Sequence, residues 1–549
     1  MKHVLVAATL GFALATASAQ ECGDTVIKGA FLASSGTPPQ AVMMRDGEVN
    51  ATFLNARTLE GEPTSIAAGK PCAITLPEGA VALPGLVDGH AHLLGIGLRE
   101  MTLNLEGTAS VAELQDRLRA AAAETPRGPI IGRGWIETGW PEGRMPTRQD
   151  LDTVAKDRVV LLTRADGHAL VANSAALWAA GIRDDTPDPD GGRIVRDADG
   201  RASGVLVDAA MGLVADLEPK LTTARRREAL KRGAALYAAR GWTGLHNMSV
   251  DAEDLPLIAD LARRGEMPLR VWSYVTPEAM ADVEPGCDPT GLACVQGVKL
   301  YVDGALGSRG ALLDEPYADE PGTRGLQLIT EEAAKAIYTE AAAKGLQVTT
   351  HAIGDAGNRL VLDWYADLMD RDARPRIEHA QVLDPRDIRR FSRQGVIASM
   401  QPSHAIGDLR FAPARLGDER LDGAYAWASL RGSGALVVGG SDAPVEVGDP
   451  QIELYAATER RGLDGYQGDD WRAREALSRR AALRLFTTSA AYAVGEEDRL
   501  GQLAPGYTAD LSVFCGDPFG GPDAATPLFT MVAGEVVSGD PDAACPVPE

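Results

Sequence analysis

The chain has 549 residues, more than a single compact core usually holds, so its length favours a large domain with at least one accessory domain. Its content of 45% hydrophobic and 24% charged residues is typical of a globular protein. The formal net charge of −23 argues against partners that need a basic surface, namely nucleic acids and anionic membranes. The acidity itself says little about the substrate; a small molecule is expected from the site residues, and a homo-oligomer is compatible with the composition.

Residues 1–19 have the features of an export signal. Lys2 and His3 form a polar start, residues 4–14 are mostly apolar, and the small residues ASA at 17–19 form a cleavage site. The apolar stretch is too short to cross a bilayer, which takes about 20 residues. We therefore expect a secreted protein in a bacterial periplasm, without a membrane anchor.

Export to an oxidising compartment would allow the cysteines to pair, and their number is even. The six are Cys22, Cys72, Cys287, Cys294, Cys515 and Cys545. Cys287 and Cys294 close the short loop CDPTGLAC, and we predict a disulfide between them. The pairing of the other four stays open. A zinc site built on cysteines is not expected, because the chain has no C-x-x-C pair.

The rest of the chain shows two different patterns of apolar and polar segments. Residues 20–83 and 495–549 run in short alternating segments broken by Gly, Pro and Asn, which predicts a split β-sandwich domain. Residues 84–494 alternate apolar strands with amphipathic stretches, such as 224–240 and 331–344. That second alternation predicts a parallel sheet with helices on its outer face.

Eight strands can be counted in this central body. They are expected to end near His90, His246, Tyr274, Asp303, His351, His379, His404 and Asp442. Eight parallel strands with intervening helices predict an α/β fold, a (β/α)8 TIM barrel, with its active site at the carboxyl ends of the strands. Residues 100–221 are too long for one crossover, so we predict an inserted subdomain there.

Histidines concentrate at the predicted strand ends. The chain has eight, of which one lies in the predicted signal and six lie at or just beyond a strand end. Structural histidines would be scattered over loops and helix faces, so this distribution indicates a metal site. His90 and His92 end the first strand as H-x-H, and side chains two residues apart on a strand can reach one ion.

A lysine on the fourth strand adds an unusual ligand. Strand alternation places Val298 and Leu300 on the outer face, and Lys299, Tyr301 and Asp303 toward the barrel interior. Burial disfavours an ammonium and supplies a neutral amine, which can react with carbon dioxide to form a carbamate. A carbamate has two oxygens that could bridge two ions. The alternative is a lysine whose ammonium reaches a carboxylate at the rim.

The later strands complete the set. His351 and His379 each end an apolar strand, and Asp442 ends the last one. Imidazole, carboxylate and carbamate ligands favour zinc, with manganese, iron or nickel as alternatives.

These residues and several longer motifs resemble the amidohydrolase superfamily. The stretches VKLYVDGALGSRGALL, THAIGDAGNR, RIEHAQ, MQPSHA, GAYAW and GSDAPVE are similar in particular to its amidohydrolase-3 branch, the YtcJ-like enzymes. The resemblance covers essentially the whole mature chain and implies two divalent metal ions. It implies that His90, His92 and Asp442 hold one ion, that His351 and His379 hold the other, and that Lys299 bridges them as a carbamate.

The predicted chemistry is hydrolysis by a metal-activated hydroxide. Bound metal ions lower the pKa of water, and Asp442 would act as general base and then as general acid. The expected substrate bond is an amide-like C–N bond of a small molecule. The alternatives are ester hydrolysis, a lyase or isomerase reaction on the same metals, and a catalytically silent periplasmic binding or regulatory protein. A serine hydrolase is not expected, because the chain has no G-x-S-x-G motif.

Other polar residues near the predicted strand ends are candidate substrate contacts. They are Asp166 and His168 in the insertion, His246 and His404, and Tyr301 and Asp303 beside Lys299. For Asp166 and His168, an ordinary polar turn is the alternative.

Overall fold

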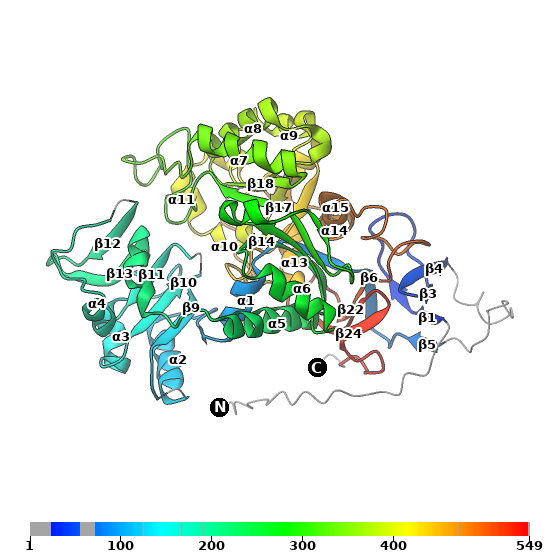
Figure 1. Cartoon of the computed structure of the whole chain (residues 1–549), viewed down its shortest axis with the longest axis horizontal. Coiled ribbons are helices and arrows are strands. Elements are labelled where there is room, and N and C mark those ends of the chain that lie inside the picture. The colour runs from blue at the N-terminus through cyan, green and yellow to red at the C-terminus, as the bar shows by residue number, and fades with distance from the viewer. Residues whose placement is uncertain are drawn as a thin grey trace.

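The computed structural model describes residues 24–54, 72–124, 126–165, 167–189, 191–469 and 471–546. The predicted export signal, Cys22 and Asp166 lie outside these residues. The described chain forms a central barrel, with an inserted subdomain on one side and a β-domain on the other (Figure 1). Within these described parts, no helix has both the length and the apolar character that crossing a membrane requires.

Eight strands form the barrel sheet. They are β7 (Leu86–Ala91), β14 (Trp242–Val250), β15 (Arg270–Val275), β17 (Ala293–Tyr301), β18 (Gln347–Ala352), β19 (Arg376–His379), β20 (Ile397–Met400) and β21 (Val437–Gly439). They lie side by side in this order, and every hydrogen-bonded neighbour pair is parallel. This arrangement confirms the predicted α/β barrel.

The first and last strands meet through glycines. A Cβ atom on Gly89 would lie 2.3 Å from the side chain of Val438, and one on Gly440 would lie 2.5 Å from the backbone nitrogen of His90. The backbone N–H of Asp442 donates to the carbonyl of His90 at 2.7 Å. The glycines therefore allow the close approach that brings His90 and Asp442 together.

Helices cover the outside and the carboxyl end of the barrel. They are α1 (Leu93–Glu100), α5 (Thr223–Arg240), α6 (Leu255–Arg263), α7 (Glu331–Lys344), α8 (Asp355–Leu368), α9 (Ile388–Gln394), α10 (Pro402–Asp408), α11 (Ala412–Leu416), α12 (Trp427–Gly432), α13 (Pro450–Glu459), α14 (Arg479–Leu485) and α15 (Thr488–Ala493). Helices α5 and α7 coincide with the two predicted ones. Thr222 and Thr330 cap their first turns, and Gly241 and Gly345 end them at φ of 102° and 73°.

Two predicted strand ends are wrong. His246 lies in the middle of β14, because that strand continues as far as Val250. His404 lies in the first turn of α10, because β20 ends at Met400 and Pro402 begins the helix. Proline favours the first turn of a helix, where its missing N–H costs nothing.

The inserted segment folds around its own sheet. Its strands are β8 (Leu103–Asn104), β9 (Ile130–Trp135), β10 (Val160–Arg164), β11 (Ala169–Ala172), β12 (Gly192–Arg196) and β13 (Ala202–Asp208), and its α-helices are α2 (Val111–Glu124), α3 (Arg148–Ala155) and α4 (Ser174–Ala179). The sheet order is β12-β13-β11-β10-β9-β8. Apolar side chains form separate cores within this subdomain.

Both ends of the chain contribute to the β-domain. One sheet has the order β4-β3-β1-β5 and the other β2-β6-β22-β23-β24. Their strands are β1 (Thr25–Lys28), β2 (Ala30–Phe31), β3 (Ala41–Arg45), β4 (Glu48–Phe53), β5 (Cys72–Thr75), β6 (Ala80–Pro84), β22 (Leu511–Gly516), β23 (Ala525–Val532) and β24 (Glu535–Gly539). The two sheets share one apolar core, and a buried ion pair between Arg270 and Asp510, at 2.8 Å, joins this domain to the barrel.

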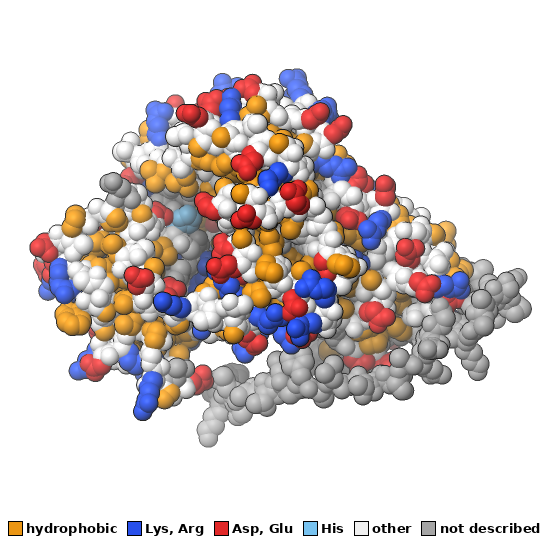
Figure 2. Space-filling model, viewed as in Figure 1, with side chains coloured by type: hydrophobic (Ala, Val, Ile, Leu, Met, Phe, Trp, Pro, Cys, Tyr) orange, Lys and Arg blue, Asp and Glu red, His pale blue; other side chains and the backbone are white. Residues whose placement is uncertain are grey.

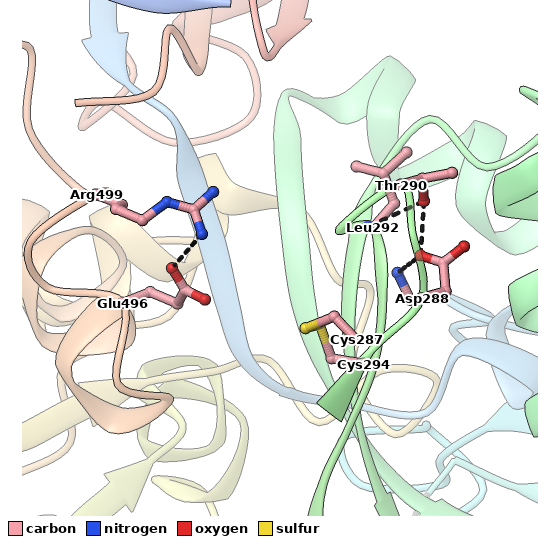
Figure 3. Close-up of a disulfide and its surroundings, with 8 residues drawn as sticks. Cys287, Asp288, Thr290, Leu292, Cys294, Glu496 and Arg499 are labelled. Carbon is pink, nitrogen blue, oxygen red and sulfur yellow. Dashed lines mark hydrogen bonds and ion pairs between the residues drawn. A yellow bond between two sulfur atoms is a disulfide. The ribbon is translucent and has the colours of Figure 1, made fainter. Parts of the chain in front are cut away.

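Disulfides join neighbouring strands and the C-terminal tail. Cys287 and Cys294 are bonded across the antiparallel pair of β16 (Gly286–Cys287) and β17 (Figure 3). Cys515 on β22 is bonded to Cys545.

The crossing of α1 and α5 offers a test of this packing. A Cβ atom on Gly97 would lie 1.7 Å from the carbonyl oxygen of Ala229, so Gly97→Ala must push the helices apart. We expect a loss of about 1–3 kcal/mol and a fall of several degrees in the melting temperature. Gly432→Ala is the control, because an added Cβ in helix α12 meets nothing within 4 Å. Equal melting temperatures for both variants in calorimetry would contradict this packing.

Candidate metal centre

Three side chains meet at the carboxyl end of the barrel. His90 on β7, His379 on β19 and Asp442 after β21 each offer a ligand atom, and these atoms lie within 4.8 Å of one another. Asp442 Oδ1 lies 3.3 Å from His90 Nε2 and 3.0 Å from His92 Nε2. His92 therefore joins the same cluster, as the H-x-H spacing predicts.

The other two predicted ligands border this cluster. The ring of His351 lies 4.4 Å from that of His379, measured between centroids. Lys299 lines the same cavity as His90, His379 and Asp442, and its Nζ lies 4.6 Å from the ring centre of Tyr301, which is 5.2 Å from that of His351. Lys299 Nζ and His351 Nε2 are buried, and neither has a hydrogen-bond partner among the described residues. Buried polar atoms without partners are rare in folded proteins. Such atoms beside three convergent ligand atoms fit a centre that binds metal.

Burial sets the protonation of these ligands. It lowers the pKa of Lys299 to about 8, against the opposing effect of Glu378 and Asp442. It also holds the pKa of His351 and of His379 well below the usual range, so both imidazoles are neutral and able to bind a cation. Burial alone would raise the pKa of Asp442, but His90 and its neighbours outweigh burial and keep that pKa well below its usual range.

Hydrogen bonds orient three of the four histidines. Nδ1 of His90 lies 2.5 Å from Glu378 Oε2, Nδ1 of His92 lies 3.1 Å from the carbonyl of Met248, and Nδ1 of His379 lies 2.9 Å from Gln401 Oε1. An acceptor at Nδ1 leaves Nε2 for a metal ion and fixes the ring plane.

Glu378 contacts the metal centre through His90 but is not among the site residues that the sequence predicts. Its side chain is fully buried, and it accepts hydrogen bonds from Arg376 Nε, at 2.8 Å, and from Thr349 Oγ1. Arg376 is also fully buried. The signal was present in strand β19, where period-two alternation turns Ile377 outward and the two charged residues inward.

Two metal-centre residues adopt an uncommon backbone conformation. His379 has φ of 72° and Asp442 has φ of 60°, values that favour glycine. Such conformations persist where the surrounding structure enforces them, and they concentrate at functional sites.

A cavity of about 1050 Å³ opens above the metal centre, between the barrel and the inserted subdomain. Figure 2 shows a hollow between these two parts, with a histidine side chain visible inside it. Of the predicted substrate contacts, His168, Tyr301 and His404 line the cavity. His168 Nδ1 lies 2.9 Å from Asp208 Oδ1, and Tyr301 Oη lies 2.5 Å from Ser249 Oγ.

The structure places the other two described candidates away from the cavity lining. His246 is fully buried, and its Nδ1 lies 2.8 Å from Nη1 of Arg376. Asp303 is also fully buried, and its carboxylate accepts backbone N–H groups of Leu312, Ile353 and Gly354. Both side chains therefore form hydrogen bonds with the protein around the centre and do not face the cavity.

The family of the chain follows from its similarity to known proteins. Residues 78–538 match the model of the amidohydrolase family. The chain belongs to that family. The protein of Bacillus subtilis strain 168 named "Putative amidohydrolase YtcJ" is 35% identical over 521 residues, which cover 91% of this chain and 96% of YtcJ.

Two further relatives agree with this assignment. The structure of an uncharacterised metal-dependent hydrolase from Pyrococcus horikoshii OT3 is similar with a TM-score of 0.73 and 26% identity, over 90% of this chain and 98% of that one. The N-substituted formamide deformylase of Arthrobacter pascens is 25% identical over 503 residues, which cover 87% of this chain and 90% of that enzyme. With the histidine–carboxylate cluster, they identify a metal-dependent hydrolase of the amidohydrolase family.

The hydrogen bond that Glu378 accepts from His90 should control metal affinity. Glu378→Gln keeps the size of the side chain but removes its charge, so we expect metal binding to weaken about 10- to 100-fold. Glu453→Gln is the matched control, because this fully buried glutamate accepts the backbone N–H of Ser403 and, among the residues that the structure describes, forms no hydrogen bond or ion pair with a predicted ligand. The measurement is the metal content of each folded variant after incubation with increasing concentrations of a chelator. If the two variants retained metal equally, Glu378 would not control metal affinity.

Proposed function

We propose that this protein hydrolyses an amide-like C–N bond of a small molecule. The position of Asp442 carries the proposal. Its Oδ1 contacts Nε2 of His90 and of His92, whereas its Oδ2 lies 3.7 Å from Nε2 of His404, a residue of the cavity wall. One carboxylate oxygen therefore faces the ligands, and the other faces the space that a substrate would enter.

The ligand set supports two divalent ions, with zinc as the first choice and manganese, iron or nickel as alternatives. His90, His92 and Asp442 would hold one ion, and His351 and His379 the other. When bound, such ions supply Lewis acidity toward the scissile carbonyl and lower the pKa of a water molecule to generate hydroxide.

Lys299 would supply the bridging ligand as a carbamate. Its neutral amine adds to carbon dioxide, a C–N bond forms, and one proton leaves to solvent. The buried Nζ without a partner and the lowered pKa of Lys299 both support this modification. A free ammonium would instead repel two cations. At 4 Å that repulsion is about 4 kcal/mol per pair for an effective dielectric near 20.

Asp442 would carry the proton, and three other side chains would contact the substrate. Asp442 would accept a proton from the attacking water and deliver it to the leaving nitrogen. His404, with its buried and unpartnered Nε2, would contact the polar group of the substrate nearest to Asp442. Tyr301 and His168 line the same cavity and would contact the remainder of the substrate.

The type of bond cleaved and the cellular compartment are also part of the proposal. The name of the Arthrobacter relative, an N-substituted formamide deformylase, supports C–N bond cleavage over ester hydrolysis or a lyase reaction. Export to a bacterial periplasm is supported by the sequence of residues 1–19 and by the disulfides.

A substrate panel tests the proposed reaction. We expect the metal-loaded protein to hydrolyse N-formyl and N-acetyl amines faster than the matching esters, and to lose this activity on chelation. Asp442→Asn should reduce turnover at least about 1000-fold, since it removes both a ligand and the proton carrier. Asp367→Asn is the control, because that exposed carboxylate on α8 pairs with Lys335 and does not line the cavity. Ester hydrolysis without amide hydrolysis, or full activity in Asp442→Asn, would contradict the proposal.

A further inference from the structure

One wall of the cavity is acidic. Glu106 after β8, Asp408 at the end of α10 and Glu446 after β21 all line it, and we refer to these three residues as the acidic wall. Burial first, and then repulsion from Asp408, Glu106 and Asp442, raises the pKa of Glu446 well above its usual range. An anion in that position costs free energy until a cation or a strong donor reaches it.

Two members of the acidic wall already have partners. Asp408 Oδ2 accepts hydrogen bonds from Gln381 Nε2, at 2.9 Å, and from Tyr425 Oη, at 2.5 Å. Glu106 Oε1 lies 3.4 Å from Nη1 of Arg99. The Glu446 carboxylate, in contrast, accepts no hydrogen bond from any residue that the structure describes, and its Oε1 lies 4.0 Å from His404 Nε2.

His404 gives independent evidence for a polar ligand at this position. Its side chain is 11% exposed and the whole residue only 8%, and Nε2 has no hydrogen-bond partner among the described residues. That nitrogen lies between two carboxylates, 3.7 Å from Asp442 Oδ2 and 4.0 Å from Glu446 Oε1. Three polar groups thus converge on one point beside the metal centre, and a substrate group with N–H donors would satisfy them.

The backbone that carries Glu446 is held in place from behind. The buried guanidinium of Arg99 donates to the carbonyls of Glu446 and Val447, at 3.1 and 3.2 Å. The indole of Trp242 donates to the carbonyl of Gly448 at 2.9 Å. Glu446 is therefore set at a fixed distance from the centre and is not a mobile residue of the rim.

Two cationic side chains of the cavity lining have carboxylate partners of their own. Arg164 pairs with Glu137 at 2.8 Å, and Arg410 pairs with Asp464. Neither pair includes a residue of the acidic wall, so these two guanidinium groups do not neutralise Glu446.

We propose that Glu446 binds a protonated nitrogen of the substrate, so that the enzyme prefers amides that carry a second, cationic amine. This inference rests on the proposed function and names its substrate class. Both carboxylates lie within 4.0 Å of His404 Nε2, so Glu446 and Asp442 are no more than about 8 Å apart. A short alkyl chain between the amide and the amine covers that distance. The apolar side chains of Ile406, Phe411 and Ile452 line the cavity and would contact such a chain.

A pair of matched probes tests the preference. N-(4-aminobutyl)formamide carries an ammonium where N-pentylformamide carries a methyl group of similar size. We expect kcat/KM of the metal-loaded enzyme to be about 10- to 100-fold higher for the cationic probe, which is the value of a charge-assisted hydrogen bond. Glu446→Gln should abolish this ratio, mainly by raising KM for the cationic probe, and leave the neutral probe nearly unchanged. Asp367→Asn, which changes an exposed carboxylate that does not line the cavity, should keep the ratio of the wild type.

Equal kcat/KM for the two probes in the wild type would overturn the inference, as would an equal loss on both probes in Glu446→Gln. Failure of the proposed function gives a different result, in which neither formamide is hydrolysed. Calorimetric binding of the two probes then still tests Glu446. Tighter binding of the cationic probe that is lost in Glu446→Gln supports the inference, and equal affinities contradict it.

Discussion

The contact that closes the barrel sets the geometry of the metal centre. Strands β7 and β21 approach through Gly89 and Gly440, and the backbone N–H of Asp442 bonds to the carbonyl of His90. Ligands from opposite ends of the barrel sequence are thereby held side by side. Since a Cβ atom at either glycine would collide with the facing strand, the distance between His90 and Asp442 depends on backbone packing. It does not depend on the flexibility of the two side chains.

A buried ion pair near this contact determines the orientation of the ligand His90. Burying Arg376 and Glu378 costs desolvation energy, which their ion pair and other polar contacts offset, since the pKa of Glu378 stays well below its usual range and that of Arg376 above it. The pair is useful because Glu378 orients His90, and because Arg376 also engages His246 and Tyr274. The positive φ of His379 and of Asp442 is a second local cost. Both costs fall on residues of the centre, as expected where function constrains the chain.

The sequence predicts the barrel and its ligand set because both depend on local patterns. H-x-H spacing, period-two alternation around Lys299 and histidines at strand ends can be read within a few residues. Helix α10 shows where such reading fails, since Pro402 begins it before His404 is reached. The roles of Glu378 and Glu446 depend on which elements become neighbours. Glu378 lies opposite His351 in the pairing of β18 with β19, and Glu446 meets His404 only in the folded barrel.

The central claim is that side chains held by barrel closure bind metal with a carboxylated lysine. Anomalous X-ray diffraction from crystals grown with zinc and bicarbonate tests it most directly. We predict two anomalous peaks, one within bonding distance of His90, His92 and Asp442 and one within bonding distance of His351 and His379. We also predict density for a carbamate on Lys299 between the peaks. Peaks elsewhere on the protein, or a bare amine at Lys299 in a metal-loaded centre, would contradict this account.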